Sequence, residues 1–172
     1  MGAVTGYAAG VRYIAPNADV QLAEIGSWAD QASAKELALT MYNSGINFIF
    51  HNAGGSALGA LEAAKTAERF MVGFDANQNN LDATHILASS HKNHDDVIDR
   101  FFADFVAGTF HGGENVVNSY ANDGLKFTYQ EGLEVPDDIA AVMEAVKANL
   151  ASGELVPPSS EEELAGWNQT LS

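Results

Sequence analysis

Apolar residues recur at helical spacing in five stretches of the chain. In one of them, Ala34, Leu37, Ala38 and Met41 follow an i, i+3, i+4, i+7 pattern, which places their side chains on one face of a helix. Aspartate, proline and glycine residues at the ends of such stretches are typical of helix boundaries. The pattern predicts helices over residues 5–14, 30–42, 58–69, 95–107 and 136–151.

Short runs rich in β-branched and aromatic residues lie between these helices and predict strands. The most informative run, residues 46–52, leads into the small-residue turn Ala53-Gly54-Gly55 and then into a helix. Strands are predicted over residues 19–25, 46–52, 70–74, 85–89, 116–120, 125–129 and 153–156. Because helices connect most successive strands, we expect an α/β fold with a doubly wound, mostly parallel sheet of the flavodoxin-like type.

The length and the composition narrow the domain count and the choice of partners. We expect one α/β lobe over residues 1–156 and an acidic C-terminal tail over residues 157–172, anchored by Leu164 and Trp167. The formal net charge is −15 with only eight Lys and Arg residues. Since nucleic acids and anionic membranes are bound through basic side chains, we expect neither as a partner.

The residue types also limit the chemistry. The chain contains no cysteine, which excludes disulfides and zinc–thiolate sites, and its five histidines lack metal-binding spacing. We therefore expect no metal and no cofactor. The first residues lack the basic start and apolar core of a signal peptide. We expect either a cytoplasmic protein or one whose export signal lies outside this chain.

Candidate binding residues follow each of the first four predicted strands. They are Trp28, Asn52, Gly54, Gly55, Asp75, Asn77 and Lys92. Because the carboxyl ends of parallel strands meet at one edge of a doubly wound sheet, we expect these residues on a single rim. An indole stacks on a flat ring with a gain of roughly 1 kcal/mol beyond burial, and a carboxylate and an ammonium group bind hydroxyls through charge-assisted hydrogen bonds. The rim suits a small molecule with a flat apolar part and a polyhydroxyl part.

Each of these residues also has a purely structural interpretation. Trp28 could close the edge of the core, Asp75 could be a turn residue, and Lys92 could be a solvated loop lysine. We interpret Asp30 mainly as a helix cap. No nucleophile elbow, metal set or pair of carboxylates follows the predicted strands, which disfavours a hydrolase that would use Asp75 as a base.

Several motifs resemble those of one family. They are Gly6–Val11 (GYAAGV), Gly26–Asp30 (GSWAD), Phe48–Gly55 (FIFHNAGG), Val72–Gln78 (VGFDANQ), Ile86–Lys92 (ILASSHK) and Val135–Ile139 (VPDDI). In this order, over nearly the whole chain, they are similar to the basic membrane protein family of substrate-binding lipoproteins, which includes the purine nucleoside receptors of ABC transporters. The resemblance implies one lobe of a type I periplasmic binding protein, matching the second lobe and the C-terminal segment of the family but not its first lobe.

The resemblance also implies roles for the rim. Trp28 would stack on the base, Gly54 and Gly55 would lie along the ligand, and Asp75 and Lys92 would bind the ribose hydroxyls. The family more often has Asp where this chain has Asn77, so the contact expected there is left open. A single rim covers roughly half of a ligand that normally sits in a closed cleft, so we expect weak binding by the isolated lobe.

The function expected from these observations is that of a non-catalytic solute-binding lobe for a purine nucleoside. By resemblance, the partner is an ABC transporter permease and the location is extracytoplasmic. A two-fold dimer that pairs two exposed rims would rebuild a cleft, so a homodimer is also expected. The alternatives are an interaction module that has lost ligand binding, a small hydrolase on a flavodoxin-like fold, and a response-regulator-like domain, which the single acidic residue Asp30 in the first loop disfavours.

Overall fold

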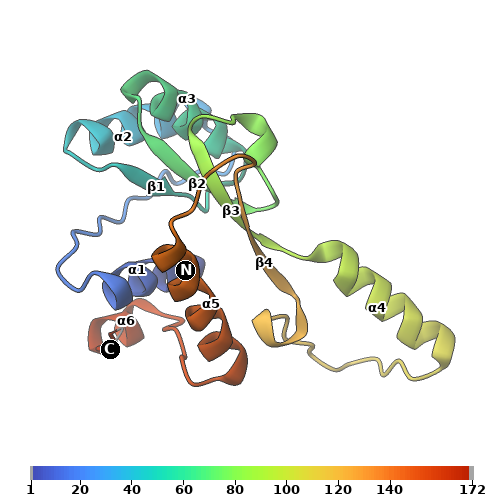
Figure 1. Ribbon diagram of the computed structural model, residues 1–172. Helices are drawn as coiled ribbons and strands as arrows, with labels where there is room; N and C mark the ends of the chain where they lie inside the picture. The colour runs from blue at the N-terminus through green and yellow to red at the C-terminus, as the bar shows by residue number, and fades with distance from the viewer. Residues whose placement is uncertain (1, 171–172) are drawn as a thin grey trace.

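The protein is built on a four-stranded sheet. A computed structural model describes residues 2–170, and its strands lie in the order β1 (Phe48–Phe50), β2 (Phe70–Asp75), β3 (Ile86–Lys92), β4 (Leu125–Tyr129). The pairs β1–β2 and β2–β3 are parallel, whereas β4 runs antiparallel to β3. The expected α/β fold with a mostly parallel sheet is thus confirmed (Figure 1).

Helices lie on both sides of this sheet. The α-helices are α1 (Gly2–Ile14), α2 (Gln31–Asn43), α3 (Ala57–Ala67), α4 (His94–Ala107), α5 (Asp137–Ser152) and α6 (Glu161–Gly166). Three short 3₁₀ helices are η1 (Gly54–Ser56), η2 (Asn79–Leu81) and η3 (Tyr120–Asn122). Figure 1 shows α2 and α3 above the sheet and α1, α5 and α6 below it, while α4 projects away from the body.

The main core lies between the sheet and the pair α2–α3. Alternate residues of a strand point to opposite faces, so Ile49 and Met71 enter this core while Phe50 stacks on Tyr7 of α1 with ring centroids 4.7 Å apart. The two helices approach closely at Gly59, where an added Cβ would lie 1.9 Å from the carbonyl oxygen of Gln31. This close contact fixes α3, and with it the turn that precedes α3, against the sheet.

Three predicted strands are absent from the structure. Residues 19–25 run as irregular chain beside β1, and no backbone hydrogen bond joins the two segments within the described residues. Residues 116–120 were expected to pair with β4, but Asn122 folds back to accept from the amide of Ser119 and ends that segment in η3. Residues 153–156 follow α5, where the amide of Leu155 donates to Asn149 instead of to a strand.

The C-terminal residues pack against the first helix. Leu164 of α6 is buried against Ala8 and Ala9 of α1, and the indole N–H of Trp167 donates to the carbonyl of Val156 at 3.2 Å. Both side chains therefore anchor the last segment of the chain. The boundary at residue 156 between a lobe and a tail stays a prediction.

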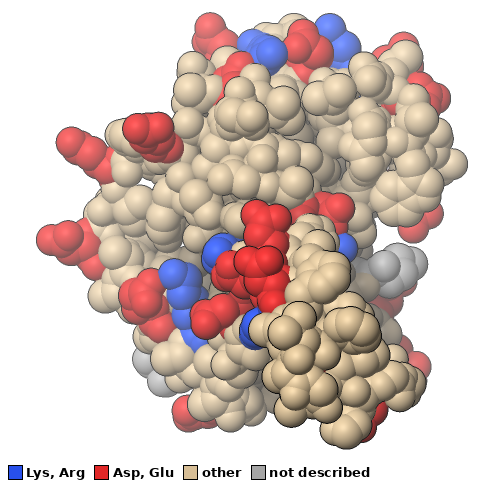
Figure 2. Space-filling view, turned by 90° about the vertical axis from the view of Figure 1, so that its right-hand side faces the viewer, with Lys and Arg blue, Asp and Glu red and all other residues tan. Residues whose placement is uncertain are grey.

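Helix α4 is present as predicted but its apolar face is not part of a core. Phe102 and Phe105 are 59% and 64% exposed, and no residue of α4 is buried. Viewed from the side on which α4 projects, the lower part of the molecule shows a broad area without charged side chains beside a group of acidic ones (Figure 2). Among residues 2–170, no helix has the length and apolar character needed to cross a membrane.

Candidate functional site

The candidate site lies at the carboxyl ends of β1, β2 and β3. Gly54 and Gly55 follow β1, Asp75 is the last residue of β2, and Lys92 is the last residue of β3. These strands are neighbours and parallel, so their carboxyl ends face the same edge of the sheet. The structure therefore brings these predicted residues to one rim, although it does not test whether they bind a ligand.

Trp28 belongs to the same rim. The carbonyl oxygen of Trp28 accepts from the amide of Ser56, and the hydroxyl of the buried Ser56 donates to the carbonyl of Ser27. An added Cβ on Gly54 would lie 3.3 Å from the indole Cε3, so the ring packs directly on the glycine turn. Trp28 is nevertheless 67% exposed, which shows that it does not close the edge of the core.

Asp75 and Lys92 form an ion pair on the rim. The distance from Lys92 Nζ to Asp75 Oδ1 is 2.6 Å, and the hydrogen bond from Lys92 holds the pKa of Asp75 below its ordinary value. Both side chains are more than half exposed, so the pair contributes at most about 1 kcal/mol to stability. The backbone of Asp75 has φ of +73°, a left-handed conformation that costs a non-glycine residue about 1–3 kcal/mol.

The two predicted asparagines differ in their surroundings. The side-chain oxygen of Asn77 accepts from the amide of Asn79 at 3.1 Å, which makes Asn77 a turn residue and leaves its NH₂ group and one lone pair of the oxygen for a ligand. Asn52 lines a groove of about 870 Å³ that also reaches Trp28 and runs between residues 18–28 and the edge of β1. Residues 19–25, predicted as a strand, form one wall of this groove instead of pairing with β1.

Asp30 is a helix cap, as interpreted from the sequence. Its carboxylate accepts from the amide of Ser33 at 3.0 Å, and that bond is the main reason why its pKa is lowered. The amide of Asp30 in turn donates to the hydroxyl of Ser56 at 2.8 Å. The cap thus helps to fix the loop that carries Trp28.

Sequence reasoning missed a buried polar cluster beneath the rim. It consists of His51, Gln78, Asn79 and Ser89, which are joined by hydrogen bonds. His51 is 7% exposed, and burial lowers its pKa while the hydrogen bond with Gln78 partly offsets that effect. A serine within the apolar run of β3 and a histidine directly after β1 were the available signals, since polar residues at buried strand ends need partners.

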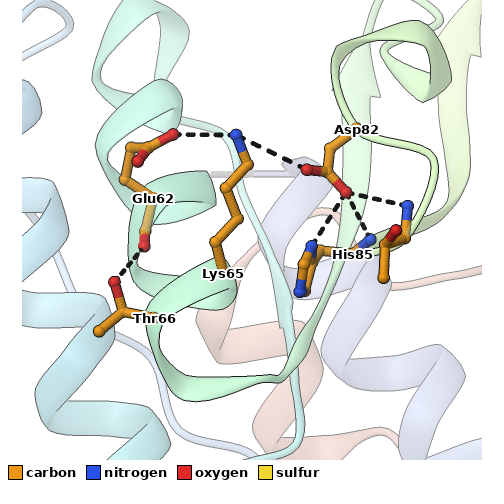
Figure 3. A network of polar contacts seen from close by, with 6 residues as sticks. Glu62, Lys65, Thr66, Asp82 and His85 are labelled. Atoms are coloured by element: carbon orange, nitrogen blue, oxygen red, sulfur yellow. Dashed lines mark hydrogen bonds and ion pairs between the residues drawn. The ribbon is translucent and has the colours of Figure 1, made fainter.

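A second polar cluster lies at the opposite edge of the sheet. Asp82 precedes β3, and its carboxylate accepts from the amides of Thr84 and His85 and from the ring of His85 at 2.8–2.9 Å. Although burial raises the pKa of Asp82, these bonds outweigh it and lower the pKa to about 2. Lys65 of α3 lies between Asp82 and Glu62 (Figure 3). This cluster ties α3 to the start of β3 and takes no part in the rim.

The described part of the chain offers no evident metal centre. Among residues 2–170, no group of three or more His, Cys, Asp or Glu side chains is arranged to hold a metal ion. The rim instead combines an exposed indole, a glycine turn and an ion pair. Side chains of these types can stack on a ring and form hydrogen bonds with hydroxyls.

Comparison with known proteins gives a consistent result. Residues 2–151 match the model of the family Bmp, described as ABC transporter substrate-binding protein PnrA-like. Basic membrane protein A1 of Borrelia garinii subsp. bavariensis is 26% identical over 160 residues, which cover 91% of this chain and 47% of that protein. The ABC transporter nucleoside-binding protein BmpA of Lactococcus lactis subsp. cremoris is 26% identical over 172 residues, which cover 90% of this chain and 48% of that protein.

A solved structure shows the same fold. The ABC transporter solute-binding protein from Aeropyrum pernix K1 superposes with a TM-score of 0.74 at 24% identity, covering 95% of this chain and 55% of that one. The chain spans about half the length of the curated relatives it matches. The likeness therefore concerns one half of a longer architecture.

Proposed function

Because the chain belongs to the Bmp family of PnrA-like ABC transporter substrate-binding proteins, we propose that it is a non-catalytic solute-binding lobe for a purine nucleoside. One relative is named as a nucleoside-binding protein, which supports this choice of ligand. The same assignment implies an extracytoplasmic location and delivery of the ligand to a transporter permease.

One observation of the structure carries the proposal. The exposed indole of Trp28 packs on the turn at Gly54, and the Asp75–Lys92 pair lies at the same edge of the sheet. A base would stack on the indole, and the carboxylate and the ammonium would accept from and donate to the ribose hydroxyls. The ion pair would open to share those hydroxyls, at little cost because it is solvent-exposed.

The lobe would bind its ligand weakly by itself. A cleft normally buries most of a small ligand, whereas one rim covers roughly half of it. Since each ~1.4 kcal/mol of lost contact reduces the affinity tenfold, we expect dissociation constants in about the millimolar range for the isolated chain. A homodimer that pairs two rims would bury the other half of the ligand.

Calorimetric titration with adenosine, guanosine and inosine tests the proposal. We expect saturable binding of at least one of them, and a loss of about tenfold or more in affinity for Trp28→Ala and for Asp75→Asn. Glu62→Gln is the matched control, because it alters an ion pair at the opposite edge of the sheet. Equal affinities for the wild type and its three variants, or no saturation at any nucleoside concentration reached, would refute the assignment of the rim as the binding site.

An interaction module without ligand binding is the second candidate, and the uncovered apolar face of α4 favours it. Such a module would give no binding heat with nucleosides but would sediment as an oligomer. A hydrolase would convert the nucleoside to base and sugar, which chromatography after long incubation detects. We expect the nucleoside to be recovered unchanged.

A further inference from the structure

A buried serine links the strands beneath the rim. Ser89 of β3 has no exposed surface. Its hydroxyl oxygen accepts from the backbone amide of Gln78 at 3.0 Å, and the hydroxyl donates to the side-chain oxygen of Asn79 at 2.6 Å. One side chain therefore binds two consecutive residues of the loop that follows Asp75.

These hydrogen bonds extend across the sheet in both directions. The ring Nε2 of His51 lies 2.7 Å from the side-chain oxygen of Gln78, which connects the loop to the end of β1. The side-chain amide of Asn79 donates to the carbonyls of Thr128 and Tyr129 at 3.2 and 2.9 Å, which connects it to β4. The loop is thus held to three strands through a single chain of polar contacts.

The glycine at position 73 makes room for this chain. An added Cβ on Gly73 of β2 would lie 2.5 Å from the hydroxyl oxygen of Ser89 and 3.0 Å from the Cβ of Gln78. A side chain at position 73 would therefore displace either Ser89 or the loop that contains Gln78.

Asp75 lies between this glycine and the bound loop. Its left-handed backbone conformation, with φ of +73°, is less favourable than extended backbone even for an aspartate, so contacts of the neighbouring segments help to maintain it. The side chain of Asp75 is 59% exposed, so packing against the body does not hold it in place. The constraints come from the ladder between β2 and β3 on one side and from Gln78 and Asn79 on the other.

We propose that Ser89 is a positioning residue for the rim: by fixing Gln78 and Asn79 it holds Asp75 in its strained conformation, with the carboxylate facing Lys92. Ser89 does not contact the ligand itself. Its effect on affinity rests on the proposed nucleoside function, whereas its effect on the Asp75–Lys92 pair does not.

The first experiment needs no ligand. Carboxyl-carbon NMR measures the pKa of Asp75, which Lys92 holds below the ordinary value of 3.8. In Ser89→Ala the amide of Gln78 and the oxygen of Asn79 lose their partner, the loop loosens, and we expect the pKa of Asp75 to rise toward that ordinary value. Thr40→Ala is the control, since it removes a similar hydroxyl-to-carbonyl bond from the exposed side of α2 and should leave Asp75 unchanged.

A folded Ser89→Ala protein in which Asp75 titrates as in the wild type would overturn the proposal. If Ser89→Ala does not fold, Ser89→Cys replaces it, because the thiol fills the site with a larger group that is a weaker donor and acceptor. The expected result is then a smaller rise of the Asp75 pKa, and an unchanged value again overturns the proposal.

A double-mutant cycle on nucleoside affinity tests the consequence for binding. We expect Ser89→Ala to weaken binding about tenfold in the wild type and to have no further effect in Asp75→Asn, because the serine acts through that carboxylate. Additive losses would contradict a role through Asp75. If the wild type binds no nucleoside, the proposed function fails, but the NMR measurement still decides whether Ser89 positions Asp75.

Discussion

At the scale of single residues, the side chains of the rim that face solvent differ from the buried side chains that fix their loops in place. Trp28, Asp75 and Lys92 are exposed, whereas Ser56 and Ser89 are fully buried and bind the loops that carry Trp28 and Asp75. The sequence indicated the exposed group because indole, acid and amine follow predicted strands. It did not indicate the buried serines, since a small polar residue in an apolar run has no fixed partner until the loops are placed.

His51 makes the folded state sensitive to pH. Its ring Nδ1 is buried and finds no hydrogen-bond partner among residues 2–170, and burial lowers its pKa below the ordinary value of 6.5. The unfolded chain therefore takes up a proton at this residue at a higher pH than the folded chain. It follows that His51 stabilises least at acidic pH, and that its contribution is lost as the pH falls from 6.5 toward the lower folded-state pKa.

Urea unfolding at two pH values measures this effect. When the pH is lowered from about 7.5 to about 5, we expect the free energy of unfolding to fall by on the order of 1 kcal/mol more in the wild type than in His51→Gln. His111→Gln is the control, because it replaces an exposed histidine outside the polar cluster around His51. The same pH dependence in all three proteins would contradict a buried neutral His51.

At the scale of elements, local pattern located the helices well and the strands less well. All five predicted helices are present. Helical spacing of apolar residues is a local feature of the sequence, and a helix forms its hydrogen bonds within itself rather than with a distant segment. Residues 19–25, 116–120 and 153–156 had suitable composition for strands, but a strand exists only where a neighbouring edge pairs with it. Local pattern also could not show that the apolar face of α4 lies outside the core.

Two glycines in helices respond oppositely to alanine. An added Cβ on Gly59 of α3 meets the carbonyl of Gln31, so Gly59→Ala should force α2 and α3 apart and destabilise the fold by about 1–3 kcal/mol. An added Cβ on Gly10 of α1 meets nothing within 4 Å, so Gly10→Ala should stabilise by about 0.5–1 kcal/mol. Denaturant unfolding measures the change in the free energy of unfolding for both variants. Changes of the same sign would contradict the close packing of α2 on α3 at Gly59.

Because the apolar face of α4 is exposed, we expect the fold to tolerate a charged side chain there. Phe105→Glu should change the free energy of unfolding by less than about 0.5 kcal/mol, because the ring is 64% exposed. Met71→Ala, at a position 2% exposed in the main core, should cost about 2–5 kcal/mol. Thermal unfolding of both variants compares them, and a large loss in Phe105→Glu would show that the face of α4 is buried.

At the scale of the whole molecule, the chain has an α/β fold built on one four-stranded sheet and matches about half of its longer relatives. The sequence predicted this architecture because strand, turn and helix recur in order, and because the motifs that follow the strands resemble one family. The groove beside β1 was not predicted, since it arises where residues 19–25 stay apart from the sheet. The rim is a product of topology, as residues from distant parts of the chain meet there only after the strands pair.

The most direct test of the central claim is the fluorescence of Trp28 during titration with a purine nucleoside. Trp167→Phe leaves Trp28 as the single indole, and its exposure makes it open to stacking. We predict saturable quenching by the nucleoside, little effect of ribose alone, and a weaker response once Asp75→Asn and Lys92→Met are introduced. Fluorescence that does not change, or quenching that is the same with and without the ion pair, would contradict the account.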